Sequence, residues 1–248
     1  MTEDTVRPAG APALSPTLPA ARWSLVLPVK RLALAKSRLD GFAGARRPDL
    51  ALAFALDTVA AALACPAVAR VLVVTRDEVA AARLAALGAL VVDDEPLDPA
   101  DAGAGAGGHG GYGGYGGHEA LNSALAHGAV RARRHAPDAP VATLSADLPA
   151  LRPAELGRVL AAVPATGRAF LADAPGTGTT LLACRPGAPL RPAFGPGSRS
   201  RHAADGAHEL GCGDVPSVRR DVDTAADLAE ALTLGVGPQT AAVAAALV

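Results

Sequence analysis

Lys30 and Lys36 are the only lysines among the 23 lysine and arginine residues of this 248-residue chain. Both lie in one short segment, LPVKRLALAKSRL, and arginine serves everywhere else. A compact ammonium group can turn toward a phosphate oxygen in positions that a planar guanidinium does not always reach. The two lysines therefore indicate a local phosphate site. The alternative is that both are ordinary residues of a solvated face that remain lysine by chance.

Three aspartates have the spacing of magnesium ligands. Asp147 follows an apolar run in LSADLPAL, and Asp221 and Asp223 alternate in RRDVD. Residues two apart on an extended segment point to the same side, and Mg2+ takes carboxylate oxygens together with phosphates and waters. The alternative is helix capping, by Asp147 near Pro153 and by the other two near Asp227. Combined with the lysines, the three carboxylates favour a Mg2+ site.

Two segments rich in Gly, Ser and Thr complete this set, residues 176–180 (GTGTT) and 194–202 (FGPGSRSRH). Their backbone N–H groups and hydroxyls can bind a carboxylate or a phosphate, and a simple turn at Pro196 is the alternative. His202 can be either a donor that faces a ligand or an ordinary helix residue. No HExxH, GxxxxGK[ST] or Ser-His-Asp pattern occurs, which argues against zinc-protease, P-loop and hydrolase functions.

The elements that must position these residues follow from apolar runs and helical periodicity. We expect strands at residues 23–29, 68–75, 89–92, 140–145, 169–171 and 179–184. We expect helices at residues 50–64, 77–87, 118–135 and 153–162, near 227–234, and in the Ala-rich C-terminal segment. This alternation predicts an α/β fold, a three-layer α/β/α domain with a mostly parallel sheet. Ligands of such sheets bind beyond the carboxyl ends of the strands, where the polar segments above begin.

Composition suggests the organisation of the rest of the chain. Residues 1–21 are expected to form a disordered tail, and residues 22–248 a single domain with a flexible Gly-rich loop at 99–117. No apolar run reaches the length of a membrane span, and no signal-peptide core is present. The formal net charge of -1 provides no electrostatic footprint for nucleic acid. We expect a cytoplasmic protein that binds neither nucleic acid nor membrane, and its three scattered cysteines to be reduced thiols.

Six segments in a fixed order resemble one enzyme family. LPVKRLALAKSRL, ALNSAL, LSADLPAL, GTGTTLL, FGPGSRSRH and RRDVDTAADL are similar to motifs of the 2-phospho-L-lactate / phosphoenolpyruvate guanylyltransferases of coenzyme F-420 biosynthesis. The resemblance covers residues 23–235 and implies a Rossmann-like, GT-A-like nucleotidyltransferase domain. It also implies transfer of GMP from GTP to phosphoenolpyruvate or 2-phospho-L-lactate, with Mg2+ as cofactor and pyrophosphate as product. The Ala- and Arg-rich composition looks actinobacterial, and for such a chain the resemblance implies phosphoenolpyruvate in preference to 2-phospho-L-lactate.

The resemblance further implies roles for individual residues. The residues implied to hold nucleotide phosphates or to lie near the nucleotide are Lys30, Lys36 and Asn122. The metal-binding aspartates are Asp147, Asp221 and Asp223, and those assigned to catalysis are Lys30, Lys36 and Asp147. The positions implied to hold the carboxylate end of phosphoenolpyruvate are Thr180, Gly195 and Ser198.

Two other functions compete with this one. A molybdopterin or sugar-phosphate nucleotidyltransferase would usually carry a GxxxRxGxxK loop after the first strand, which PVKRLALAKSRL replaces here. A non-catalytic nucleotide-binding subunit would have no need to keep both lysines and all three aspartates. The labile product predicts a transient contact with a downstream transferase, and a homo-oligomer is left open.

Overall fold

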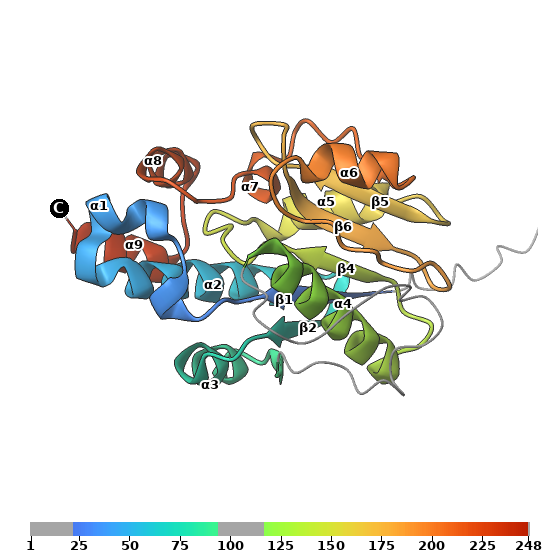
Figure 1. Ribbon diagram of the computed structural model, residues 1–248, viewed down its shortest axis with the longest axis horizontal. Helices are drawn as coiled ribbons and strands as arrows, with labels where there is room; N and C mark the ends of the chain where they lie inside the picture. Colours follow the sequence, from blue (N-terminus) through green and yellow to red (C-terminus); the bar gives the residue numbers. More distant parts are fainter. Residues whose placement is uncertain (1–21, 94–116, 248) are drawn as a thin grey trace, which may run out of the picture.

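The computed structural model describes residues 22–93 and 117–247. Within these ranges seven strands form one sheet in the order β3-β2-β1-β4-β6-β5-β7 (Figure 1). The strands are β1 (Trp23–Pro28), β2 (Val68–Val74), β3 (Leu90–Val92), β4 (Val141–Leu144), β5 (Arg168–Ala172), β6 (Thr179–Cys184) and β7 (His208–Glu209). β6 runs antiparallel to β4 and β5, and the other pairs are parallel. The start of β6 therefore lies at the same sheet edge as the ends of β1, β2 and β4.

Helices cover both faces of this sheet. The main helices are α2 (Arg47–Leu63), α3 (Glu78–Ala86), α4 (His118–His135), α5 (Pro153–Ala162), α6 (Ser198–Ala204), α8 (Ala225–Leu234) and α9 (Pro238–Ala245). The shorter ones are α1 (Asp40–Ala43), α7 (Pro216–Arg219) and the 3-10 turns η1 (Leu32–Leu34), η2 (Ser37–Leu39) and η3 (Gly44–Arg46). These three layers confirm the predicted α/β/α architecture.

Alternation along β1 shows how the layers are held together. Leu25 and Leu27 are fully buried among side chains of α2, α3 and α5, whereas Val26 points to the opposite face and packs under α4. α4 lies so close to the sheet that a Cβ on its Gly128 would come within 2.4 Å of a methyl carbon of Val26 and 2.7 Å of one of Val74. Only glycine fits at this contact, which fixes the height of α4 above β1 and β2.

A third apolar cluster forms one end of the molecule, where α1, α8 and α9 gather (Figure 1). It contains Leu39 from the segment after β1, Phe54 from α2 and Val222 from the RRDVD segment, all fully buried. Leu228 of α8 packs into the same cluster. The cluster thus anchors the lysine-containing segment and the RRDVD segment on shared apolar contacts.

The predicted elements agree with the observed ones, with identical bounds for α4, α5 and β6. Periodicity missed β7, α1 and α7, which are only two to four residues long. It also missed α6, because the glycines and Pro196 before it are typical of a turn. The predicted tail at 1–21 and almost all of the Gly-rich loop at 99–117 lie outside the described residues. In the described ranges, no helix has the length and apolar character needed to cross a membrane.

Candidate active site

The segment after β1 has a fixed shape. Lys36 has a left-handed backbone, with φ 58° and ψ 40°, which is uncommon for a residue other than glycine. Arg47 of α2 donates hydrogen bonds to the carbonyl oxygens of Ala33, over 2.9 Å, and Ala35. The backbone N–H of Leu32 donates to the Asp77 carboxylate over 2.9 Å. These contacts hold the Lys36 side chain over the carboxyl ends of the strands.

The segments that carry the three aspartates meet at this edge. The N–H of Val222 donates to the carbonyl oxygen of Asp147 over 3.0 Å, which joins the residues after β4 to the residues after α7. The Lys36 ammonium donates to the carboxylate of Asp147 and, over 2.7 Å, to that of Asp223. Lysine and aspartates predicted from separate motifs thus form one cluster.

The charged groups of this cluster shift one another's pKa values. Burial alone would lower the pKa of Lys36, but the charges of Asp147 and Asp223 outweigh burial and raise it. Burial, reinforced by the charges of Asp147 and Asp223, raises the pKa of Asp221 to about 7, and Lys36 offsets only part of this effect. Burial alone would raise the pKa of Asp223, but the charge of Lys36 brings this pKa below its ordinary value. Three carboxylates share the largely buried ammonium of Lys36, and the charges of Arg38 and Lys30 also act on Asp223.

The donor set of this cluster is all oxygen, which is the set Mg2+ prefers. Within the two described ranges, however, no three His, Cys, Asp or Glu side chains are arranged so that they could hold a metal ion. The ammonium of Lys36 lies between two of the carboxylates instead. A metal at this cluster would therefore compete with Lys36 for Asp147 and Asp223. Lys30 is exposed, and its charge contributes to the low pKa of Asp223, so it lies within electrostatic range.

Helix capping does not explain these aspartates. α5 begins after Arg152 without any side-chain cap. α8 is capped by Thr224, whose hydroxyl accepts from the N–H of Asp227 while the Asp227 carboxylate accepts from the N–H of Thr224. The capping alternative for Asp147, Asp221 and Asp223 is therefore wrong.

Thr180 and Ser198 lie on the β6 side of the cluster. Thr180 is fully buried, and its carbonyl oxygen accepts from the N–H of Ser145, directly after β4. Its Oγ1 has no hydrogen-bond partner in the part of the chain that the structure describes. Ser24 and Thr240 have buried hydroxyls of the same kind, so what points to a ligand at Thr180 is its position beside the end of β4. Ser198 is also buried, at the start of α6, and its N–H donates to the Gly195 carbonyl over 3.0 Å.

The residues 193–198, here called the acceptor loop after the role that the resemblance implies for Gly195 and Ser198, are held from α6. Arg201 donates to the carbonyl oxygens of Ala193 and Pro196. The fully buried His202 accepts at Nε2 from the N–H of Ala193 over 3.0 Å, and its Nδ1 lies 3.0 Å from Oγ1 of Thr179. Burial, followed by the charge of Arg201, lowers the pKa of His202 to about 4. His202 is therefore a neutral anchor of the loop and not a donor to a ligand.

Asn122 lies at the acceptor loop. Its Oδ1 accepts from the N–H of Phe194 over 2.7 Å, and its Nδ2 donates to the carbonyl oxygen of Phe194 over 3.1 Å. Asp173 shapes the GTGTT turn in a similar way, by accepting from the N–H groups of Thr177 and Gly178. Arg219 then donates to the carbonyl oxygen of Asp173 over 2.9 Å. The sequence provided no signal for Arg219, since the contact spans two distant segments.

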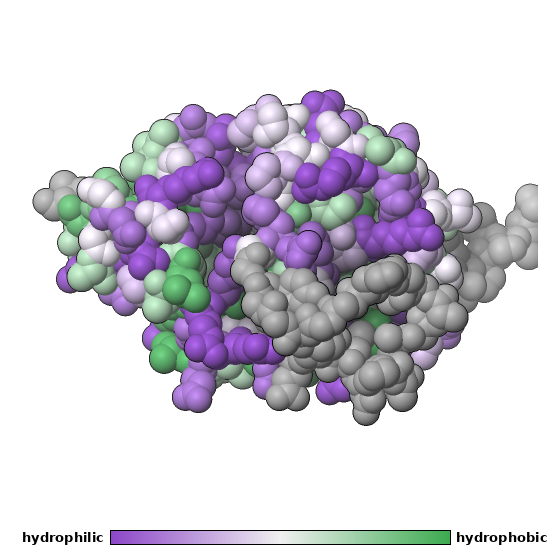
Figure 2. Space-filling model, viewed as in Figure 1, coloured by the Kyte–Doolittle hydropathy of each residue, from purple (hydrophilic) through white to green (hydrophobic). Residues whose placement is uncertain are grey.

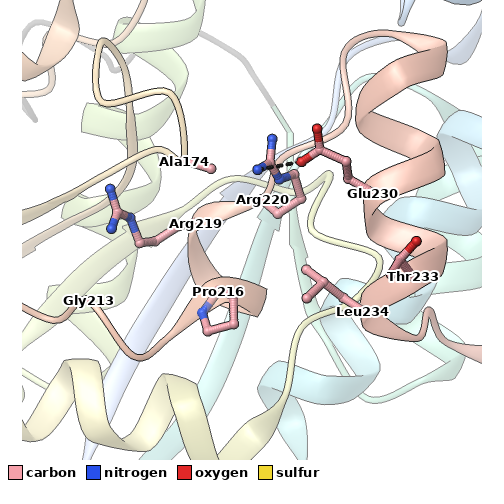
Figure 3. A pocket seen from close by; sticks show the side chains of 8 residues that line it. All are labelled: Ala174, Gly213, Pro216, Arg219, Arg220, Glu230, Thr233 and Leu234. Carbon is pink, nitrogen blue, oxygen red and sulfur yellow. Dashed lines mark ion pairs between the residues drawn. The ribbon is translucent and has the colours of Figure 1, made fainter.

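Two cavities flank the cluster. One, of about 600 Å³, lies at the carboxyl ends of β2 and β3 and is lined by Arg31, Thr75, Arg76, Asp77, Glu78, Ala81, Val91 and Asp93. The other, of about 350 Å³, lies between α7 and α8 (Figure 3). There Arg220 forms an ion pair of 2.6 Å with Glu230, while Arg219 points away from both. In the surface view, hydrophilic side chains gather over the hollow between α8 and α6 (Figure 2).

Comparison with known proteins defines the chain as a nucleotidyltransferase. A nucleotidyl transferase from Methanothermobacter has the same fold, with a TM-score of 0.51 at 17% identity over 86% of this chain and 96% of that chain. A phosphoenolpyruvate guanylyltransferase of Streptomyces coelicolor is 60% identical over 227 residues, which cover 91% of this chain and 97% of the relative. Its counterpart in Thermomonospora curvata is 59% identical over 90% of this chain and 89% of the relative. The chain therefore belongs to the phosphoenolpyruvate guanylyltransferase family, which confirms the resemblance seen in its motifs. No protein-family model matches the chain.

Proposed function

We propose that this protein transfers GMP from GTP to the phosphate of phosphoenolpyruvate and releases pyrophosphate, as a step in coenzyme F-420 biosynthesis. The observation that carries this proposal is the identity of about 60% with guanylyltransferases over nearly the whole chain. The cluster of Lys36 with three aspartates supports it, because an ammonium group can pair with a phosphate and carboxylates can hold a metal ion that neutralises phosphate charge. An acceptor role for 2-phospho-L-lactate is the alternative within the same chemistry.

In the proposed reaction, an oxygen of the acceptor phosphate forms a bond to the α-phosphorus of GTP. The bond from that phosphorus to the bridging oxygen of the β-phosphate breaks, and pyrophosphate leaves with the electron pair. A phosphate monoester is largely ionised near pH 7, so no proton has to be removed first. The work left to the protein is to align the two phosphates and to offset their charge.

The nucleotide is proposed to lie across the β1–β3 side of the site. The cavity of about 600 Å³ at the ends of β2 and β3 is large enough for a nucleoside and is lined by Arg31. Arg31 directly follows Lys30, so the cavity continues into the lysine segment. In this arrangement Lys30 and Lys36 hold the triphosphate.

The acceptor is proposed to lie on the β4–β6 side. The unpartnered, buried Oγ1 of Thr180 and the buried Ser198 at the start of α6 support a role for these residues in holding the carboxylate. The backbone of Gly195 would complete the contact. The Lys36–aspartate cluster then lies between nucleotide and acceptor.

Mg2+ is proposed to bind Asp147, Asp221 and Asp223. The three carboxylates bring oxygen donors alone to one place, and this donor set supports the assignment. When bound, Mg2+ would neutralise phosphate charge and hold the two substrates in line. Lys36, released from Asp147 and Asp223, would turn to the triphosphate.

The test is to incubate the purified protein with GTP, Mg2+ and either phosphoenolpyruvate or 2-phospho-L-lactate, and to follow pyrophosphate release. We expect release that depends on the acceptor and on GTP, with ATP as the control nucleotide, and faster release with phosphoenolpyruvate. The labile product can inhibit, so the assay is repeated with the downstream transferase and its deazaflavin acceptor. No release in that complete mixture would refute the proposed acceptors.

A further inference from the structure

The side chain of Asn122 makes two hydrogen bonds to a single residue of another predicted segment. Its amide pairs with both backbone groups of Phe194, over 2.7 Å and 3.1 Å. Two residues of neighbouring strands pair their backbone N–H and C=O groups in the same way. Here the side-chain amide of Asn122 takes the place of one of the two backbones. Gly195, the next residue, belongs to the proposed carboxylate site.

The first turn of α4 makes a second contact with this loop. Gly195 has a φ of +121°, and a Cβ built on it would lie 2.7 Å from Cγ of His118. The His118 side chain is thus packed directly against the Gly195 backbone. His118 and Asn122 are one turn apart on α4 and lie on the same side of the helix. The same turn of α4 therefore touches two consecutive residues of the acceptor loop.

The acceptor loop needs such contacts because its own sequence is permissive. Gly195 and Gly197 have φ values of +121° and +71°, a region that glycine enters freely and that leaves many other conformations open to it. Arg201 and His202 fix Ala193 and Pro196 from α6. The ring of Phe194 is buried against His202, and its backbone N–H and C=O are both hydrogen-bonded to the side chain of Asn122.

We propose that Asn122 is a positioning residue for the acceptor substrate: it holds Phe194 so that Gly195 and Ser198 are ordered before phosphoenolpyruvate binds. The inference deepens the proposed function and depends on it. It reassigns Asn122 from the nucleotide to the acceptor side of the site. Loss of Asn122 then leaves the lysine segment and the nucleotide cavity intact, and acts on acceptor binding.

The experiment measures kcat and both KM values for Asn122→Ala and His118→Ala in the full chain, with Ser123→Ala as the control. Ser123 is an exposed neighbour on the same turn, so its variant reports any general effect of altering this helix. For Asn122→Ala we expect KM for phosphoenolpyruvate to rise about tenfold, the usual equivalent of one or two lost hydrogen bonds. KM for GTP and the Ser123→Ala values should stay within about twofold of the wild type.

His118→Ala keeps the inference testable if Asn122→Ala fails to fold, because His118 is exposed and its loss removes only the support of Gly195. It should raise KM for phosphoenolpyruvate by about threefold and leave KM for GTP unchanged. A rise in KM for GTP with an unchanged acceptor KM would instead make Asn122 a nucleotide contact and overturn the inference. Equal rises in the KM for GTP and the KM for phosphoenolpyruvate, or no rise in either, would also overturn the inference. A wild type that is inactive with both acceptors would refute the proposed function itself.

Discussion

The N–H of Val222 donates to the carbonyl oxygen of Asp147 over 3.0 Å. Through this bond, the segment after β4 and the segment after α7 move as one unit. Val222 is fully buried in the apolar cluster at the α8–α9 end, so Asp221 and Asp223 on either side of it have little freedom to shift. The relative positions of the three aspartates are therefore set by backbone and core contacts before any ligand binds.

Replacing Asp147 with Asn should slow the reaction severely. The change removes one of the three carboxylates proposed to hold Mg2+, which would offset phosphate charge, and we expect kcat to fall by a factor on the order of 100 or more, about 3 kcal/mol. Turnover is measured at saturating Mg2+ and GTP. Asp138→Asn is the matched control, because Asp138 is exposed in the turn that precedes β4. Near-normal turnover of the Asp147 variant would rule out its proposed role.

Replacing Lys36 with Met should change metal binding in the absence of nucleotide. The Lys36 ammonium lies between Asp147 and Asp223, so its removal leaves both carboxylates open to a cation. We expect Mn2+ affinity, followed by electron paramagnetic resonance, to rise about tenfold, while GTP binding weakens. Lys30→Met is the comparison, since Lys30 is exposed. If Mn2+ affinity were the same in wild type and Lys36→Met, competition between the ammonium and a metal would be disproved.

The buried His202 should make the protein sensitive to acid. Its pKa is about 4 in the folded chain, below its ordinary value of 6.5. Neutral His202 therefore stabilises the fold fully above about pH 6.5, and this contribution is lost as the pH falls from 6.5 toward 4. The unfolding free energy lost in this way can reach on the order of 3 kcal/mol.

Urea unfolding at pH 7.5 and pH 5 tests this prediction. His202→Gln should be less stable than the wild type at pH 7.5 and should show a smaller loss between the two pH values. His135→Gln, at the exposed end of α4, should behave as the wild type. If the wild type and His202→Gln lost the same unfolding free energy between pH 7.5 and pH 5, the acid sensitivity would come from other groups.

Asp57 of α2 should be needed to hold α9. Its two carboxylate oxygens accept from the N–H groups of Gln239, over 3.1 Å, and Thr240, over 2.7 Å, so a side chain far away in the sequence caps this helix. Asp57→Ala should cost about 1–2 kcal/mol of unfolding free energy, and proteolysis should release the C-terminal segment sooner. Asp49→Ala, an exposed change in the same helix, should cost about 0.5 kcal/mol. Equal costs for the two variants would contradict the cap.

The sequence was sufficient to predict the three layers of the fold and the edge of the sheet at which the candidate site lies. Apolar runs such as β6, and the periodicity of α4, are local signals, and both bounds were predicted correctly. The partners of the site residues were not predictable in this way. Whether Asn122 faces the lysine segment or Phe194 depends on β6 running antiparallel beside β4, which brings residue 194 next to α4.

The environment of His202 shows the same limit. Its position in FGPGSRSRH suggested either a ligand contact or a helix residue, and nothing in the spacing distinguishes the two. The distinction comes from burial against Phe170 and Phe194 and from the two hydrogen bonds of the ring, which belong to tertiary structure.

Gly128 sets α4 directly on β1 and β2, and Asn122 lies six residues earlier on the same helix, about 9 Å along its axis. The centre of the sheet and the acceptor loop are thereby linked by one rigid segment. A methyl group added at Gly128 would clash with Val26 and Val74 and force either α4 or these side chains to shift, although Gly128 touches no substrate in the proposed arrangement. With Asn122 in its proposed role, the packing of Gly128 on Val26 and Val74 would bear on selectivity for the acceptor although it lies beneath α4.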